Sequence, residues 1–253
     1  MLTRRLSILG AHINALTWDD ALGQILAWGH GHESRYVSMC NVHSVVTTTR
    51  DQQFKSVINS ADLALADGAP IAWAIRKLGH IRQERISGPD LMWRYLAEAE
   101  RFAQVVFFFG GTDATLVKLS AAIRVRFPKL MIGGTCSPSF SGSTVEEDEG
   151  HVRTINRAGA HVVFIGLGCP KQEIWMAAHR GRIDAVMIGV GAAFDFHAGT
   201  IKRAPLWWQR NGLEWLYRLC SEPKRLFRRY LVTNTLFLVG ISRQLIGIAM
   251  SRK

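Results

Sequence analysis

The chain lacks the residue spacings that commonly hold metal ions. Its four cysteines lie far apart and form no Cys-x-x-Cys pair, and its nine histidines include no His-Glu-x-x-His sequence. These absences exclude the common zinc and iron–sulfur motifs and a disulfide framework, and they favour a reducing compartment. There is also no Asp-x-Asp, the usual carboxylate pair for a divalent ion that bridges a nucleotide diphosphate. We therefore expect neither a metal site nor a cofactor.

Two sequence signals for other protein classes are absent as well. The basic N-terminus is followed by the apolar run Leu6–Ile13, but this run is short and is broken by Gly10 and His12. It therefore does not fit a secretory signal, and we expect the protein to stay in the cytoplasm. No Gly-Lys-Ser or Gly-Lys-Thr occurs anywhere, which excludes a P-loop.

Acidic residues are scarce in the C-terminal fifth of the chain. The 253 residues include 31 Lys and Arg against 20 Asp and Glu, a formal charge of +11. Residues 202–253 contain eleven Lys and Arg but only two Asp and Glu. The other 201 residues contain twenty Lys and Arg and eighteen Asp and Glu. We therefore expect two parts, an α/β domain at 1–201 and a basic appendage at 202–253. The basic appendage indicates an anionic partner. Nucleic acid is disfavoured as that partner, because nucleic-acid-binding proteins usually have their basic face on the folded body.

Short apolar runs alternate with helix start signals through the first 200 residues. The runs predict six buried strands: Tyr36–Cys40, Leu63–Ala66, Val105–Phe109, Leu130–Ile132, Val162–Ile165 and Ala185–Ile188. Helix-capping residues precede several of the intervening segments: Thr17, Ser87 and Thr112. This alternation is typical of an α/β fold with a mainly parallel sheet and helices on both faces. We expect Gly133–Thr144, rich in Gly, Ser and Thr, to form a loop.

The appendage combines aromatic with basic residues. Four aromatic side chains stand among its arginines and lysines: Trp207, Trp208, Trp215 and Tyr217. We expect a new helix with Pro223 in its first turn. The uncharged stretch Tyr230–Ser242 would span roughly 20 Å as a helix, less than the ~30 Å hydrocarbon core, and Arg243 and Gln244 follow it. The sequence therefore predicts a helical segment that lies on or dips into a membrane surface rather than spanning it.

Polar residues directly follow the first two predicted strands. Asn41 comes after one and Asp67 after the other, each before a predicted helix. Two interpretations stay open for each residue: it caps the helix, or it contacts a ligand at the carboxyl ends of the strands. In the second case Asp67 is placed as a general base. His43 and His197 flank the same region, but an isolated histidine is more often structural.

Two glycine-rich loops follow the last two predicted strands. They are Gly166–Glu173 and Gly189–Phe196, and glycines there let the backbone approach a ligand. Neither loop matches the dinucleotide fingerprint, because Lys171 and Phe194 occupy the third glycine position. The pair of loops predicts one ligand with a phosphate and a sugar part. Asp195 either contacts that ligand or caps a helix.

These motifs together resemble the WecG/TagA/CpsF glycosyltransferases over nearly the whole chain. The resemblance rests on Asn41, Ala66-Asp67-Gly68, Gly88-Pro89-Asp90, Phe109-Gly110-Gly111, Gly166-x-Gly-x-Pro-Lys-Gln-Glu and Gly191–Asp195. It continues in the appendage with Lys202-Arg203-Ala204-Pro205, Gly212–Leu219 and Glu222-Pro223-x-Arg225. The family transfers a sugar from a UDP-sugar to a polyprenyl-diphosphate-linked saccharide, with inversion and without an Asp-x-Asp metal site.

The resemblance implies roles for particular residues. Asp67 is similar in position to the family's catalytic base. The implied substrate-binding residues are Asn41, Gly110, Gly111, Gly166, Gly168, Lys171, Gln172, Glu173, Gly191 and Asp195. The implied contacts with the lipid diphosphate and the membrane are Arg218, Arg225 and Arg228. Ser38 stands near a position at which some members have threonine.

The resemblance also implies a setting for the reaction. The donor would be a UDP-sugar of N-acetylmannosamine, its uronic acid or glucose, and the acceptor a polyprenyl-diphosphate-linked saccharide for exopolysaccharide or another cell-surface polymer. The enzyme would associate peripherally with the inner face of the cell membrane. The sequence leaves open whether the chain forms a homo-oligomer.

Two alternatives come from other functional classes. One is a dinucleotide-dependent oxidoreductase, which both glycine loops disfavour. The other is a nucleic-acid- or membrane-binding module that uses the basic appendage, which leaves Asp67, Gln172 and Asp195 without roles. Calorimetry with UDP, NAD and an oligonucleotide would separate the three classes.

Overall fold

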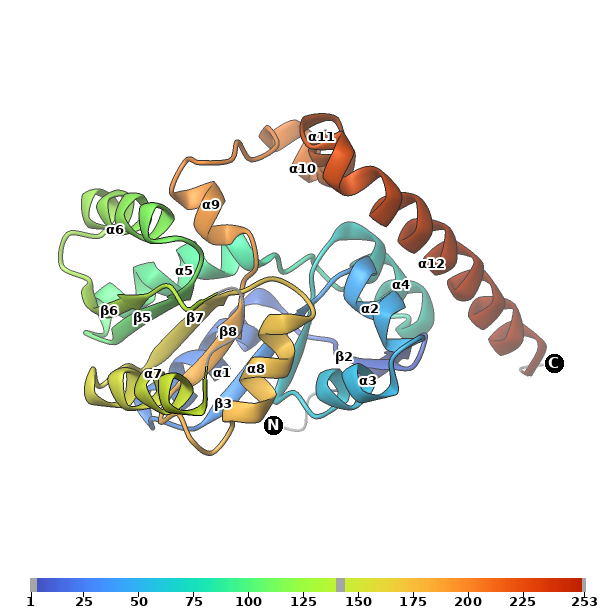
Figure 1. Cartoon of the computed structure of the whole chain (residues 1–253). Helices are drawn as coiled ribbons and strands as arrows, with labels where there is room; N and C mark the ends of the chain where they lie inside the picture. The colour runs from blue at the N-terminus through green and yellow to red at the C-terminus, as the bar shows by residue number, and fades with distance from the viewer. Residues whose placement is uncertain (1–3, 140–143, 252–253) are drawn as a thin grey trace.

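The computed structural model describes residues 4–139 and 144–251, and its centre is a six-stranded parallel sheet (Figure 1). The strand order is β4-β3-β8-β7-β5-β6. The strands are β3 (Arg35–Cys40), β4 (Leu63–Ala66), β5 (Val105–Gly110), β6 (Met131–Cys136), β7 (Val162–Gly166) and β8 (Val186–Gly189). All six strands predicted from apolar runs are therefore present, and the expected α/β class is confirmed.

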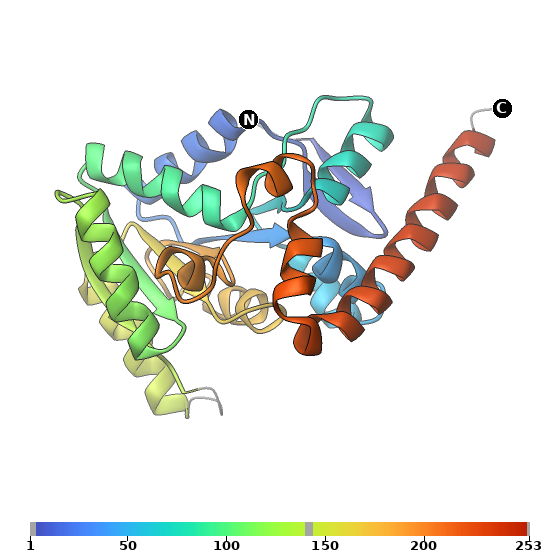
Figure 2. The same cartoon turned by 90° about the horizontal axis from the view of Figure 1, so that it is seen from above.

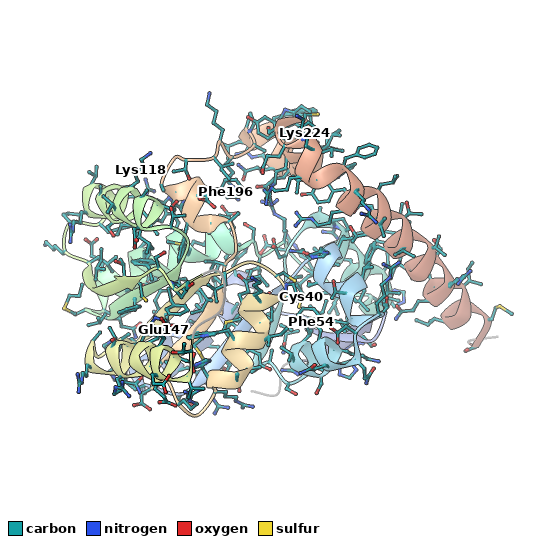
Figure 3. All side chains as sticks on the ribbon, in the orientation of Figure 1. Cys40, Phe54, Lys118, Glu147, Phe196 and Lys224 are labelled. Carbon is teal, nitrogen blue, oxygen red and sulfur yellow. The ribbon has the colours of Figure 1, made fainter. Side chains whose placement is uncertain are left out.

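Helices cover both faces of this sheet because its strands bury side chains on alternating sides. Val106 and Phe108 of β5 belong to one apolar cluster, and Phe107 and Phe109 belong to another. The first face is covered by α1 (Trp18–His30), α5 (Gly88–Arg101), α6 (Asp113–Arg126) and α9 (Ala193–His197). The second is covered by α2 (Val42–Thr48), α3 (Gln52–Asn59), α4 (Ala69–Gly79), α7 (Val145–Arg157) and α8 (Lys171–His179). Figure 3 shows Cys40 and Phe54 in this second core region.

A small hairpin precedes the sheet and was not anticipated from the sequence. Strands β1 (Arg5–Ile8) and β2 (Ala11–Asn14) pair antiparallel across Leu9 and Gly10, which both have positive φ. This is the backbone that a two-residue hairpin turn requires. The apolar run at the N-terminus therefore packs on the α/β body, where Ile8 and Ile13 are fully buried.

The predicted loop at 133–144 is partly wrong. Gly133 and Gly134 belong to edge strand β6, which continues to Cys136. A Cβ atom at Gly133 would lie 2.7 Å from Cγ1 of Val105, and one at Gly134 would lie 2.6 Å from a ring carbon of Phe107. Glycine is therefore needed for close packing at these positions rather than for a flexible turn. Residues 140–143 of the predicted loop lie outside the described residues.

The appendage forms three helices that lie above the carboxyl ends of the strands and then extend away (Figures 1 and 2). They are α10 (Leu206–Arg210), α11 (Glu214–Ser221) and α12 (Pro223–Ser251). Helix α12 begins at the expected proline and packs along α2, burying Leu226, Phe237 and Ile241. The side-chain amide of Gln244 also accepts from the backbone N of Leu9 and donates to the carbonyl of Ser7.

Helix α12 is longer than the helix predicted from the uncharged stretch Tyr230–Ser242. It continues without a break through Arg243 and Gln244 and has 29 residues, roughly 43 Å. Within the part of the chain that the structure describes, it is the one helix long and apolar enough to cross a membrane by length and composition. That this helix lies on or dips into a membrane surface rather than spanning it stays a prediction.

Candidate active site

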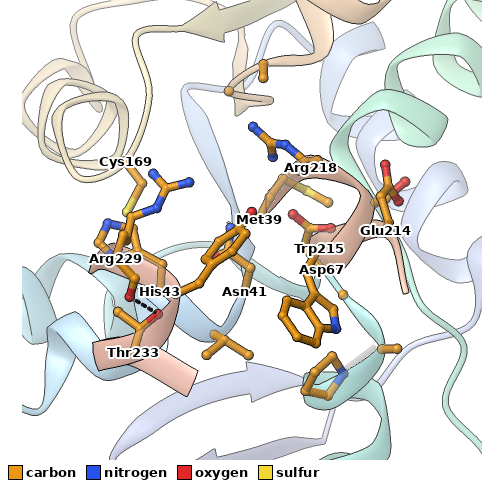
Figure 4. Close-up of a pocket in the computed structure, with 18 of the residues that line it drawn as sticks. Met39, Asn41, His43, Asp67, Cys169, Glu214, Trp215, Arg218, Arg229 and Thr233 are labelled. Carbon is orange, nitrogen blue, oxygen red and sulfur yellow. Dashed lines mark hydrogen bonds between the residues drawn. The ribbon is translucent and has the colours of Figure 1, made fainter. Parts of the chain in front are cut away.

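A cavity of about 460 Å³ lies between the carboxyl ends of the strands and the appendage (Figure 4). Strands β3, β4, β7 and β8 each bring the residues that follow them to its floor, as expected for parallel strands. These residues include Asn41, Asp67, Gly168, Cys169, Gln172 and Gly191. The opposite wall comes from α11 and α12, with Glu214, Trp215, Arg218, Arg225, Arg229 and Thr233. The appendage therefore completes a cavity that the α/β body leaves open.

Asp67 projects into this cavity from the end of β4. Its backbone N donates to the carbonyl of Cys40 at 2.9 Å, and Gly68, with φ +95°, is the N-cap of α4. The capping interpretation of Asp67 is therefore wrong. Burial raises the pKa of its carboxyl to about 6, against the lowering effects of Arg85, Arg218 and a hydrogen bond with Asn41. A carboxylate with this pKa can hold a proton transiently near neutral pH.

Asn41 is a helix cap, which is one of the two interpretations that the sequence left open, and its contact with a ligand stays a prediction. It is the N-cap of α2, where its Oδ1 accepts from the backbone N of Ser44 at 3.2 Å and Ser44 Oγ accepts from the N of Asn41. Its side chain also hydrogen-bonds to the carboxylate of Asp67. The helix cap thereby fixes the amide that holds the carboxylate in place.

Gln172 connects the two glycine-rich loops. Its Oε1 accepts from the backbone N of Gly191 at 3.1 Å, and its Nε2 donates to Glu173 Oε1 at 2.8 Å. Glu173 is 1% exposed, and burial raises the pKa of its carboxyl. A Cβ atom on Gly189 would lie 3.0 Å from Gln172 Nε2, so this glycine makes room for the amide. Gln172 lines the cavity, whereas Glu173 lies behind it and orients the amide.

Ion pairs that the sequence did not reveal border the cavity next to Asp67. Arg85 Nη1 lies 2.8 Å from Glu214 Oε2, and Arg203 Nη1 lies 2.6 Å from Asp90 Oδ1. Cross-contacts join the two pairs, with Arg85 3.4 Å from Asp90 and Arg203 3.3 Å from Glu214. This network attaches the appendage to the start of α5. It also places one positive and one negative charge near Asp67.

The arginines of the appendage differ in their surroundings. The guanidinium of Arg218 lies over the ring of Phe196, 5.4 Å from its centroid, and its Nε is buried without a hydrogen-bond partner in the part of the chain that the structure describes. Arg225 lines the cavity and pairs with Glu222. Arg228 is exposed and does not line the cavity, whereas its neighbour Arg229 does. A contact between Arg228 and a lipid diphosphate stays a prediction.

Several glycines of the implied substrate site serve close packing in this structure. A Cβ atom on Gly110 would lie 2.6 Å from the carbonyl carbon of Gly166, and one on Gly166 would lie 2.6 Å from the ring of Phe194. Gly111 donates its N–H to the carbonyl of Gly166 at 3.2 Å. These three glycines do not line the described cavity. Their close approach brings β5, β7 and α9 together beside it.

Lys171 and Asp195 also lie outside the lining of this cavity. Asp195 is not a cap, because Ala192 is the N-cap of α9. Its Oδ1 accepts from the hydroxyl of Thr200 at 3.1 Å and from that of Thr115 at 3.4 Å. Asp195 thus ties α9 to α6 and to the chain that leads into the appendage.

Other residues of the cavity were missed as site residues by sequence reasoning. They are Arg85, Glu214, Trp215, Arg229 and Thr233. Glu214 and Trp215 lie within the segment Gly212–Leu219 that carried the family resemblance, so that motif was a usable signal. Arg85 precedes the motif Gly88-Pro89-Asp90 by three positions and had no signal of its own.

A comparison with protein families agrees with this geometry. The model of the glycosyl transferase WecG/TagA/CpsF family matches residues 6–250, which includes the α/β body and nearly all of the appendage. The match favours the glycosyltransferase interpretation over an oxidoreductase or a binding module. The chain belongs to the WecG/TagA/CpsF family of glycosyltransferases.

Proposed function

We propose that this glycosyltransferase moves a sugar from a UDP-sugar to a polyprenyl-diphosphate-linked saccharide, with inversion and without a metal ion. The family acts in the synthesis of cell-surface polysaccharides. One observation carries the finer proposal: Asp67, with its pKa raised to about 6, shares one cavity with Arg218 and Arg229. A base and unpaired cations in one cavity are what an inverting transfer from a diphosphate donor requires.

The chemistry follows from the two kinds of side chain. The acceptor hydroxyl attacks the anomeric carbon, and Asp67 takes the proton from that hydroxyl. The new oxygen–carbon bond forms as the bond from the anomeric carbon to the diphosphate oxygen breaks, and UDP leaves with the bonding electrons. Arginine side chains stabilise the negative charge that develops on the diphosphate.

Product analysis tests the proposal directly. The protein would be incubated with a lipid-linked acceptor and, separately, with UDP-N-acetylmannosamine, its uronic acid and UDP-glucose. We expect one donor to give a transferred sugar whose anomeric configuration is opposite to that of the donor. Transfer with retained configuration would exclude attack assisted by a single base, and no transfer with any donor would contradict the proposal.

Activity is expected to survive chelation. The sequence has no Asp-x-Asp, and the described residues contain no group of three or more His, Cys, Asp or Glu that could hold a metal ion. We expect the transfer rate in excess EDTA to stay within about twofold of the untreated rate. Loss of transfer that Mg²⁺ or Mn²⁺ restores would overturn the metal-independent mechanism.

The surface of the appendage supports peripheral attachment to the inner face of the membrane. Its helices expose large apolar side chains: Leu206, Trp207, Phe227, Leu231, Leu238, Val239, Ile246 and Met250. Lys224, Arg225 and Arg228 are exposed near the start of α12, and anionic headgroups attract such residues by about 1 kcal/mol each. The combination of apolar and cationic residues fits an anionic membrane surface.

Vesicle binding should depend on the apolar side chains at the start of α12. Phe227 and Leu231 are each 59% exposed and lie one helical turn apart. Burying one such side chain is worth about 1.5–3 kcal/mol, so we expect Phe227→Gln with Leu231→Gln to weaken binding at least tenfold. Co-sedimentation with anionic vesicles measures this.

A matched control is Val125→Gln, because Val125 is 86% exposed on α6, away from the appendage. We expect it to bind vesicles like the wild type. Equal binding by the double variant would show that this face does not contact the membrane. Extraction of the wild type by alkaline carbonate would distinguish surface binding from insertion.

A further inference from the structure

The cationic side chains of the cavity fall into paired and unpaired groups. Arg85 and Arg225 have carboxylate partners in Glu214 and Glu222. Arg229 has no carboxylate within ion-pair distance among the described residues, and its Nε is buried without a hydrogen-bond partner. A partly buried guanidinium without an acceptor is costly. An acceptor from outside the chain would offset this cost.

A second unsatisfied nitrogen lies beside Arg229. His43 is in α2 and Arg229 is in α12, and these two helices pack against each other. Figure 4 shows the two side chains next to one another at the end of the cavity near Cys169. The Nδ1 of His43 is buried and also lacks a hydrogen-bond partner within the described chain. Burial and the charge of Arg229 lower the pKa of the imidazole, so the ring is neutral at pH 7 and has one N–H to donate.

We propose that Arg229 and His43 form a phosphate-binding subsite of the cavity, which takes a diphosphate oxygen between the guanidinium and Nδ1. This inference rests on the proposed function. A phosphate oxygen has enough lone pairs to accept from both donors, and its charge compensates Arg229. The neighbouring Arg228 is exposed and does not line the cavity, so Arg229 rather than Arg228 is the arginine of α12 that can form this subsite with His43.

The position of the subsite fits a diphosphate from either substrate. The same cavity is lined by Gly168 and Gln172, near the start of α8, and by Phe237 and Leu238, apolar residues of α12. The polar residues suit the nucleotide end of a donor, and the apolar residues suit the isoprenoid end of an acceptor. The shared chemistry is the diphosphate, and binding experiments can separate the two sources.

The test is isothermal titration calorimetry with four ligands: UDP, uridine, farnesyl diphosphate and inorganic diphosphate. Arg229→Gln should weaken the binding of at least one organic diphosphate by about ten- to a hundredfold, the range for a hydrogen bond to a charged group. His43→Leu should weaken the same ligand by about two- to tenfold. Uridine, which has no phosphate, should bind both variants as it binds the wild type.

The matched control is Arg243→Gln, which removes an exposed arginine of the same helix that does not line the cavity. It should bind all four ligands like the wild type. If only UDP binding falls in Arg229→Gln, the subsite takes the donor diphosphate, and if only farnesyl diphosphate binding falls, it takes that of the acceptor. Should Arg229→Gln fail to fold, Arg229→Lys, which keeps the charge but loses Nε, replaces it.

Unchanged affinity for UDP and farnesyl diphosphate in folded variants of both residues would overturn the subsite and leave the proposed function intact. A wild-type protein that binds neither ligand would instead count against the proposed function. In that case inorganic diphosphate still decides the subsite. Weaker binding in Arg229→Gln supports it, and equal or undetectable binding in both proteins overturns it.

Discussion

Asp67→Asn is expected to lower kcat by about two to four orders of magnitude, the range for loss of a general base. The asparagine side chain has nearly the same shape and can still hydrogen-bond to Asn41, but it cannot take a proton. UDP binding should therefore stay close to that of the wild type. Turnover is measured with a lipid-linked acceptor, and UDP binding by calorimetry. A variant that keeps more than a tenth of the wild-type kcat would show that Asp67 is not the base.

The pH dependence provides a second signature of Asp67. Burial raises the pKa of its carboxyl to about 6, and the base acts in its ionised form. In the wild type, kcat/KM should therefore fall about tenfold per unit as the pH drops below about 6. The residual activity of Asp67→Asn should lack this acid limb. Because burial of the ionised carboxylate opposes folding above pH 6, the variant should melt no lower than the wild type there.

Glu214→Gln tests whether Asp67 or the neighbouring carboxylate of Glu214 is the base. Glu214 lines the same cavity, and its charge raises the pKa of Asp67. Its removal should move the acid limb to lower pH while much of kcat remains, because Asp67 is still present. A loss as large as that of Asp67→Asn would place the base function on Glu214 instead.

The sequence predicts the sheet and the floor of the site well, for a physical reason. Buried parallel strands appear as continuous apolar runs, and all six were found. Since parallel strands end at one edge of a sheet, Asn41, Asp67 and Gln172 could be placed together before their distances were known. The hairpin β1–β2 was missed because its short strands pair only with each other, and their signal is weaker than that of the central strands.

The wall of the site was harder to predict because it depends on how the appendage docks. The buried residues of α12 are Leu226, Thr233, Phe237 and Ile241, spaced by seven, four and four positions. This spacing places Arg229, three residues after Leu226, on the docked side and turns Arg228 away. Apolar residues occur all around α12, so the sequence alone does not show which of its sides is buried. The pairing of Arg85 with Glu214 likewise joins residues 129 positions apart.

Arg218 is expected to be the most sensitive cation of the cavity. Its guanidinium lies over Phe196, its Nε has no hydrogen-bond partner among residues 4–139 and 144–251, and its charge lowers the pKa of Asp67. Arg218 also lines the same cavity as Asp67. Arg218→Ala should lower kcat/KM by about a hundred- to a thousandfold, the effect of losing one donor that stabilises developing negative charge. Arg218→Lys keeps the charge and should lose less.

A suitable control is Arg210→Ala, since Arg210 is an exposed arginine of the appendage that does not line the cavity. Its kcat/KM in detergent should stay within about threefold of the wild-type value. Equal losses in the two alanine variants would indicate a general effect of charge rather than a role for Arg218 at the site.

The acid limb of the pH profile tests whether Arg218 acts next to Asp67. Loss of a nearby positive charge raises the pKa of a carboxyl, so the limb of Arg218→Ala should move to higher pH. Glu214→Gln should move it in the opposite direction, because it removes a nearby negative charge. Opposite shifts from two appendage residues would show that the appendage sets the charge around the base during turnover. If neither substitution moves the acid limb, the charges of the appendage do not affect the pKa of Asp67 during turnover.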